Sequence, residues 1–115
     1  MEITKTNIKG TNYSVKLNND LLILDDLLCV GLCDKQNKEI TISKKNYEFR
    51  KDVTIRHELI HAFLYESGLA NYSSDETLVD WMAFHIPQIE KAFNEIKTKI
   101  KQEENNVKNC KRKRT

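Results

Sequence analysis

Two histidines in the run His57-Glu58-Leu59-Ile60-His61 have the residue type and the spacing of a metal site on a helix. Zinc in proteins is held by imidazole nitrogens, thiolates and carboxylate oxygens that converge on one point. Residues four apart on a helix lie on one face, one turn from each other. His57 and His61 are therefore predicted to be two ligands of one Zn²⁺ ion.

Glu58 follows the first of these histidines and projects about 100° around the helix axis from it. From there its carboxylate can flank the open coordination position of a metal ion without filling it. It can take a proton from a water molecule at that position and pass it to a leaving amine. The pattern predicts Glu58 as the catalytic base of a zinc-dependent peptidase.

Glu76 is the predicted third ligand, because a second helix can bring its carboxylate back to the histidines. The run Ser73-Ser74-Asp75-Glu76 can also be a capping box, in which Glu76 folds back onto the backbone of Ser73. The two interpretations compete for one carboxylate. We favour the ligand, because the site otherwise lacks protein ligands.

Asp80 lies one turn after Glu76 on the same helix face. It is predicted to accept a hydrogen bond from the far ring nitrogen of a ligating histidine, which would fix the tautomer of that ring. His85 lies nine residues after Glu76, on the opposite side of a continuous helix, which argues against it as a ligand. Trp81 and Met82 are expected in the core.

The segment before the motif is predicted to form a small β-sheet. Residues 13–17 alternate apolar and polar, which indicates a strand, and 29–33 and 39–43 read as the two strands of a hairpin. Gly31 is a possible bulge in the first of these. Residues 21–28 are ambiguous between a short helix and irregular structure, and 44–51 are expected to connect the sheet to the helix.

Apolar residues recur at helical spacing after Asp52, which predicts a helix there. Asp52 or Thr54 can cap its start, and Gly68 is expected at its end. A second helix is expected from about Ser74 to Ile86. Pro87 then interrupts it or opens a third, amphipathic helix over residues 87–104.

The length of 115 residues is that of one domain, and no apolar run reaches the 18 to 20 residues that span a bilayer. No signal pattern precedes the first strand, so we expect a cytoplasmic protein without a membrane partner. Cys29, Cys33 and Cys110 are then expected to be reduced, the first two as small buried residues on one face.

Five of the positive charges lie in residues 108–115, so the net charge of +2 leaves 2 − 5 = −3 for the rest. We expect a domain over residues 1–107 followed by a basic, disordered tail over 108–115. A mildly acidic body argues against a nucleic-acid-binding domain.

The run from His57 to Phe63, followed by Glu76, Asp80, Trp81, Ala83 and Pro87, resembles the ImmA/IrrE-like metallopeptidases of phages and mobile elements. The resemblance covers roughly residues 12–90. It implies a minimal zincin-like fold, zinc on His57, His61 and Glu76, Glu58 as base, and a repressor or regulator as substrate. Repressor-cleaving members more often have asparagine where this chain has Asp80.

The fold class expected is α+β: a small, mostly antiparallel sheet on the motif helix, then a glutamate-bearing helix and a C-terminal amphipathic helix. The function expected is zinc-dependent hydrolysis of peptide bonds in an intracellular protein, by a monomer. Tyr65, Tyr72 and His85 are candidate donors to the oxyanion. The alternatives are a catalytically silent, metal-stabilised binding protein and a nucleic-acid-associated factor that uses the basic tail.

Overall fold

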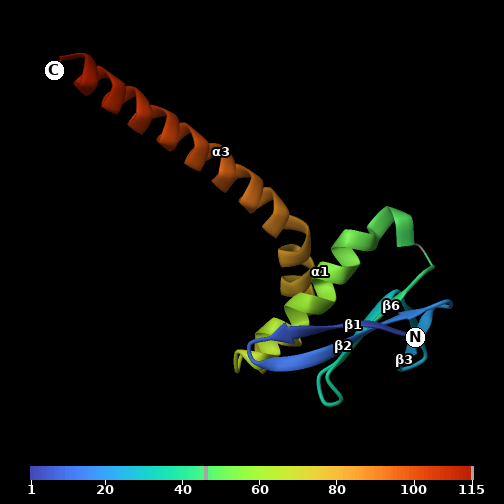
Figure 1. Ribbon diagram of the computed structural model, residues 1–115. Helices are drawn as coiled ribbons and strands as arrows, with labels where there is room; N and C mark the ends of the chain where they lie inside the picture. Colours follow the sequence, from blue (N-terminus) through green and yellow to red (C-terminus); the bar gives the residue numbers. More distant parts are fainter. Residues whose placement is uncertain (46, 115) are drawn as a thin grey trace. The chain divides into compact units, whose positions relative to one another are not determined.

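The computed structural model describes the backbone of residues 1–45 and 47–114 and the side chains of 1–45 and 52–108. The chain divides into two compact units, Met1–Phe84 and His85–Thr115. The first unit holds all six strands, helices α1 and α2 and the start of α3, whereas the second consists of the remainder of α3 (Figure 1).

A four-stranded mixed sheet forms the base of the first unit, in the order β1-β2-β6-β5. β1 with β2 and β5 with β6 are antiparallel, whereas β2 with β6 is parallel. The predicted α+β class is therefore confirmed, with antiparallel pairing in two of the three ladders. The strands are β1 (Glu2–Ile8), β2 (Thr11–Asn18), β5 (Gly31–Asp34) and β6 (Glu39–Ser43).

The core lies between this sheet and α1 (Tyr47–Glu66). Tyr13 from β2 and Ile40 and Ile42 from β6 are buried there with Ile8 of β1, and Ala62 of α1 faces them. Burying apolar side chains on one sheet face provides the main driving force for this packing. The same contact places the motif helix over the sheet. β1 was not predicted, because its residues apart from Ile3 and Ile8 are polar.

The ambiguous segment 21–28 enters a two-stranded hairpin, β3 (Leu22–Leu24) with β4 (Leu27–Cys29). Asp25 and Asp26 form the turn with φ of 50° and 64°. Two consecutive positive φ values are those of the tight turn whose twist matches that of paired strands. Apolar residues occur on both faces of this hairpin, so the sequence lacks the alternation that would have predicted it.

The prediction of one strand over residues 29–33 is wrong. Cys29 ends β4 and Gly31 begins β5. The two ends of the predicted strand therefore belong to different sheets. Gly31 pairs in register with Ile42 and is not a bulge. Cys29 and Cys33 are both partly exposed rather than buried. The predicted hairpin of 29–33 with 39–43 is confirmed only from Gly31 onward, since Gly31–Asp34 pairs with β6 in antiparallel fashion.

Helix α1 begins at Tyr47, five residues before the predicted start. Asp52 and Thr54 therefore lie inside the helix and cannot cap it. Residue 46 of the predicted connection lies outside the described residues. The predicted end at Gly68 is confirmed: its φ is 79°, and the backbone N–H groups of Gly68 and Leu69 donate to the carbonyls of Tyr65 and Leu64. These two bonds form a Schellman motif, which satisfies the last carbonyls of the helix.

A one-turn helix, α2 (Ala70–Ser73), was not predicted, and α3 (Glu76–Arg114) replaces the two expected helices. Pro87 lies inside α3, so the expected break is wrong. Trp81 was expected in the core, but about half of it is exposed (51%).

The backbone of residues 108–114 continues α3, and of their side chains the structure describes that of Lys108 alone. A separate basic tail after residue 107 stays a prediction. None of the helices, within the residues described, is long and apolar enough to cross a membrane.

Candidate metal centre

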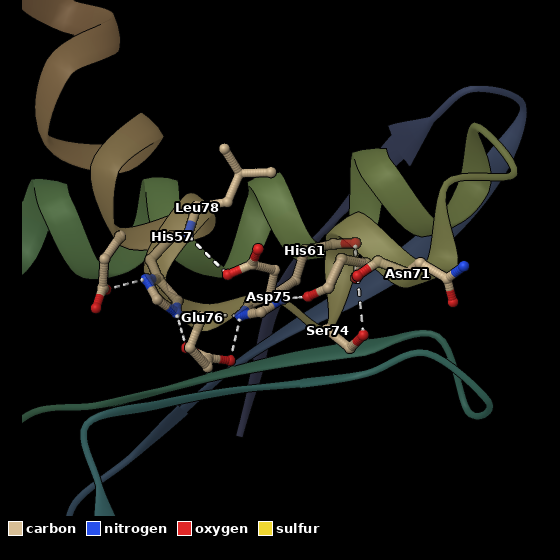
Figure 2. Close-up of polar contacts among 9 residues, drawn as sticks. His57, His61, Asn71, Ser74, Asp75, Glu76 and Leu78 are labelled. Atoms are coloured by element: carbon tan, nitrogen blue, oxygen red, sulfur yellow. Dashed lines mark hydrogen bonds and ion pairs between the residues drawn. The ribbon is translucent and has the colours of Figure 1, made fainter.

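Three side chains from two helices converge on one point in the first unit. Nε2 of His57 lies 3.1 Å from Nε2 of His61, and the Glu76 carboxylate lies 3.0 Å from the first and 2.9 Å from the second. Figure 2 shows both rings, which project from α1, pointing at the carboxylate from the first turn of α3. The residues predicted as ligands are therefore brought together.

The far nitrogen of each ring has an acceptor as its partner. Nδ1 of His57 lies 2.9 Å from the Asp80 carboxylate, and Nδ1 of His61 donates to the backbone carbonyl of Ser73. A carbonyl or a carboxylate can only accept, so in both neutral rings Nδ1 carries the proton. Nε2 of each ring then presents its lone pair to the convergence point.

Two nitrogen lone pairs and a carboxylate facing one another form a set of acceptors that needs a cation. Equal bonds of about 2.1 Å to a tetrahedral zinc ion place ligand atoms about 3.4 Å apart. The observed separations of 2.9 to 3.1 Å are close to that value. Two neutral imidazoles and one carboxylate are also a donor set that divalent zinc accepts. His57, His61 and Glu76 could thus hold a metal ion.

The start of α3 determines where Glu76 points. Asp75 is the cap, since its carboxylate accepts a hydrogen bond of 3.1 Å from the backbone N–H of Leu78. With this role filled, Glu76 is free to reach the histidines. The alternative capping box, in which Glu76 returns to Ser73, does not form.

Ser73 ties α1 to the segment that leads into α3. It is fully buried; its hydroxyl donates to the carbonyl of His61 at 2.8 Å, while its own carbonyl accepts from the His61 ring. This reciprocal pair fixes both the ring orientation and its tautomer. The sequence predicts Ser73 only as a member of a capping box. Its spacing from His61 does not indicate that the two residues contact each other.

The electrostatics of the site follow from burial and from its acidic groups. Burial lowers the pKa of His61, which favours the neutral, ligating form, although Glu76 opposes the shift. Burial also raises the pKa of Glu58 to about 8, with further contributions from the charges of Glu76 and Asp80. A cation held by the three ligands would act against that rise by favouring the carboxylate.

Glu58 lies beneath the first strand of the hairpin that precedes the helix. A Cβ added to Gly31 would lie 2.9 Å from Oε2 of Glu58 and 2.9 Å from Cγ2 of Thr54. A glycine is therefore needed for β5 to approach α1 this closely. Glu58 is buried (6% exposed), and among the described residues none donates a hydrogen bond to its carboxylate, which lines the cleft beside the ligands.

A cleft of about 640 Å³ joins the metal ligands, Glu58, the β3–β4 hairpin, β5 and the end of α2. Sequence reasoning found the ligands, but it missed the contributions of the hairpin and of Lys35. Tyr65 and Tyr72, considered as oxyanion donors, do not line this cleft. α3 is continuous between Glu76 and His85, as the argument against His85 as a ligand required. The lining residues are Leu24, Asp25, Cys29, Gly31, Leu32, Cys33, Lys35, His57, Glu58, His61, Ser73, Ser74 and Glu76.

Comparison of the chain with protein-family models, with curated protein sequences and with solved structures gave no match.

Proposed function

We propose that this protein is a zinc-dependent peptidase in which His57, His61 and Glu76 hold the metal and Glu58 is the general base. The observation that carries the proposal is the convergence of two imidazole nitrogens, 3.1 Å apart, on the Glu76 carboxylate. One carboxylate oxygen lies 3.0 Å from His57 and the other lies 2.9 Å from His61, in a cleft that Glu58 also lines. A structural zinc site usually has four protein ligands, whereas a catalytic one has three and keeps a position open.

Zinc in such a site lowers the pKa of a water molecule towards neutrality and polarises the carbonyl to be attacked. The Glu58 carboxylate accepts the proton that this water loses. Once the C–N bond breaks, the same group returns the proton to the nitrogen of the leaving amine. Asp80 and the carbonyl of Ser73 keep Nε2 of each histidine unprotonated and directed at the site.

The cleft suits an extended polypeptide. β5 is the edge strand of the sheet, and Gly31, Leu32 and Cys33 of this strand line the cleft beside the ligands. A substrate segment can pair with the free edge through its backbone, which places a peptide bond near the metal. Lys35 adds a cation to the lining, suited to the carbonyl oxygen that gains charge or to an acidic substrate side chain.

The resemblance of the His57–His61 and Glu76–Pro87 segments to ImmA/IrrE-like peptidases supports an intracellular regulator, such as a phage repressor, as substrate. Asp80 makes the contact with a ligating histidine that its position on the helix predicted, and it is an acid where repressor-cleaving members more often have asparagine. The proposal places the protein in the cytoplasm, with protein or peptide substrates and without nucleic acid.

Glu58→Gln tests the assignment. This change removes the base but preserves size, so the variant should bind one equivalent of zinc and lose cleavage of a quenched-fluorescence peptide library by at least about 10²-fold. Glu103→Gln, an exposed change of the same kind on α3, is the matched control and should cleave normally.

Two results would contradict the proposal. Absence of zinc after reconstitution under reducing conditions would remove the metal site. If the wild type and Glu58→Gln both bind zinc and both cleave only at the background rate, a metal-stabilised binding protein would be favoured instead.

A further inference from the structure

The second unit carries a stripe of apolar side chains that its single helix cannot bury. The members of this stripe are each more than half exposed: Ile89, Phe93, Ile96, Ile100 and Val107. Their successive spacings are four, three, four and seven residues. With Ile86, which lies three residues before Ile89, the stripe runs over 21 residues in six steps. The average period is therefore 3.5 residues, which is that of a coiled-coil seam. The partner that this stripe fits is therefore another helix of the same kind.

The seam positions follow from this period. Phe93, Ile100 and Val107 take the a positions, and Ile89 and Ile96 take the d positions. Ile86 extends the seam towards the start of the unit, and the d position after Ile100 is taken by a charged residue, Glu103. A carboxylate in a seam is unfavourable next to another carboxylate. Glu103 therefore discriminates between the ways in which two such helices can pair.

The flanking charges discriminate further. The e positions are Glu90, Lys97 and Glu104, and the charged g position is Lys99. Charges at these positions face each other across a coiled coil and select its orientation. Because acid, base and acid alternate along one flank, a second copy of the same helix is complementary to it only in particular registers.

A parallel pair in register brings Glu103 against Glu103 of the second copy in the seam. The only opposite charges that it brings together are Lys99 of one copy and Glu104 of the other. An antiparallel pair in which Ile96 lies opposite Ile100 brings Lys97 against Lys97 and Lys99 against Lys99. Both arrangements thus contain like charges at close range.

The antiparallel pair in which Phe93 lies opposite Ile96 of the second copy contains none. It places Glu90 opposite Lys97 twice, through the two-fold axis, and Glu103 opposite the edge residue Ile86. A two-fold pair of this kind is the commonest closed assembly. In this arrangement Ile89 also lies opposite Ile100, so four of the five stripe residues are covered, and Val107 lies beyond the paired segment.

We propose that the second unit is a dimerisation element, in which residues 86–103 of two copies form an antiparallel coiled coil with Glu90–Lys97 pairs on its flank. The inference departs from the monomer expected from the sequence, and it is independent of the peptidase assignment.

Sedimentation equilibrium of the full chain, with and without charge exchange, tests both the dimer and its orientation. Glu90→Lys or Lys97→Glu alone turns both flanking pairs into like charges, and each should raise the dissociation constant about tenfold. The double exchange restores two opposite pairs and should return the constant to within about threefold of the wild-type value.

Two controls separate orientation from simple loss of a side chain. Lys99→Glu would weaken a parallel pair but should leave the antiparallel dimer unchanged or slightly tighter. Lys97→Gln removes the contact of the Lys97 ammonium with the Phe93 ring, whose centroid is 5.8 Å away, without adding repulsion. It should weaken the dimer less than Lys97→Glu. Circular dichroism of each variant verifies that the helix persists.

A monomeric wild-type chain at 200 µM (about the upper limit for a weak specific dimer) would overturn the proposal. So would a dimer that the double exchange does not rescue. A monomer that Ile96→Glu destabilises to heat would show that the stripe is covered by the chain's own first unit, which also rejects the dimer.

Discussion

Nδ1 of His57 lies 2.9 Å from Oδ1 of Asp80, one turn beyond the Glu76 carboxylate on α3. One face of α3 therefore supplies a ligand and, four residues later, the group that orients a ligand on α1. Because the carboxylate can only accept, it keeps the ring proton on Nδ1 and directs the Nε2 lone pair at the convergence point.

Asp80→Ala should leave the fold intact and weaken zinc binding. Without the carboxylate, the His57 ring can rotate and exchange tautomers, which costs about 10- to 100-fold in metal affinity for contacts of this kind. Competition with a chromophoric chelator at pH 7 measures the change. Asp80→Asn keeps an acceptor oxygen and should lose less.

Asp26→Asn is the matched control, since Asp26 is an exposed aspartate in a turn with positive φ that asparagine also adopts. Its zinc affinity should equal that of the wild type. An Asp80→Ala variant with wild-type affinity would show that the contact with His57 does not orient the ligand.

Gly31→Ala should displace the Glu58 carboxylate. Gly31 does not have a positive φ, so alanine causes no backbone strain, and the new methyl group meets Oε2 of Glu58 and Cγ2 of Thr54 at 2.9 Å. Overpacking of this kind costs about 1 to 3 kcal/mol in the free energy of unfolding. On the proposed function, peptide cleavage should fall about 10- to 100-fold, because a small displacement of the base disturbs proton transfer.

Removing one of the two clashes provides the control. Thr54→Ser deletes Cγ2, so the pair Gly31→Ala with Thr54→Ser should recover part of the stability and part of the cleavage. Zinc stoichiometry should stay at one in both variants, because no ligand is altered. Loss of zinc in Gly31→Ala, or full cleavage by it, would contradict a role of Gly31 in positioning Glu58.

The ligands could be predicted from the sequence because helical geometry is local. His57 and His61 share a face wherever the helix lies, and the turn before α3 needs only to be short for Glu76 to return to them. The roles of Ser73 and Gly31 depend on which segments pack together. Nothing in the local pattern states that β5 crosses over Glu58 or that the carbonyl of Ser73 meets the His61 ring.

The wrong predictions have physical causes of their own. The β3–β4 hairpin was not predicted because both of its faces carry apolar residues, so the sequence does not alternate. The exposed members are Ile23, Leu24, Leu27 and Leu28. Pro87 was expected to end a helix, yet proline removes only one backbone donor, and the helical bonds on either side can carry the element onward. Local preference was overridden in both segments.

Ser73→Ala should affect stability more than metal binding. The change removes the buried hydroxyl that donates to the carbonyl of His61 at 2.8 Å, and it leaves the backbone carbonyl that accepts from the His61 ring. Loss of one such bond costs about 1 kcal/mol in the free energy of unfolding, which urea denaturation of the metal-free protein measures. Zinc affinity should change by less than about threefold, since the orienting acceptor remains.

The exposed serine Ser67 offers the comparison. Its hydroxyl donates to the carbonyl of Phe63 at the end of α1. Ser67→Ala should cost less stability than Ser73→Ala, because water can replace the lost bond there. Equal losses would mean that burial of Ser73 adds nothing.

Glu66 should make part of the stability depend on acid pH. Its carboxylate accepts hydrogen bonds from Lys38 at 2.8 Å, Tyr13 at 2.7 Å and Thr11 at 3.1 Å. These contacts, that of Lys38 foremost, hold the pKa of Glu66 below its usual range. A carboxyl whose pKa is lower in the folded than in the unfolded chain stabilises the fold above the unfolded value. That contribution disappears as the pH falls through the folded value.

The pKa of glutamate in an unfolded chain is about 4.3. Comparing the free energy of unfolding of the wild type with that of Glu66→Gln between pH 7 and pH 2.5 therefore tests whether the Glu66 charge stabilises the fold. The amide keeps an acceptor for Tyr13 but has no charge to titrate. The wild type should be the more stable protein at pH 6 to 7, and the difference in the free energy of unfolding should shrink below about pH 4. Subtracting the two curves removes the other carboxyl groups, which titrate alike in both proteins. A difference that stays constant over this range would show that the Glu66 charge, and hence its pairing with Lys38, contributes nothing to folding.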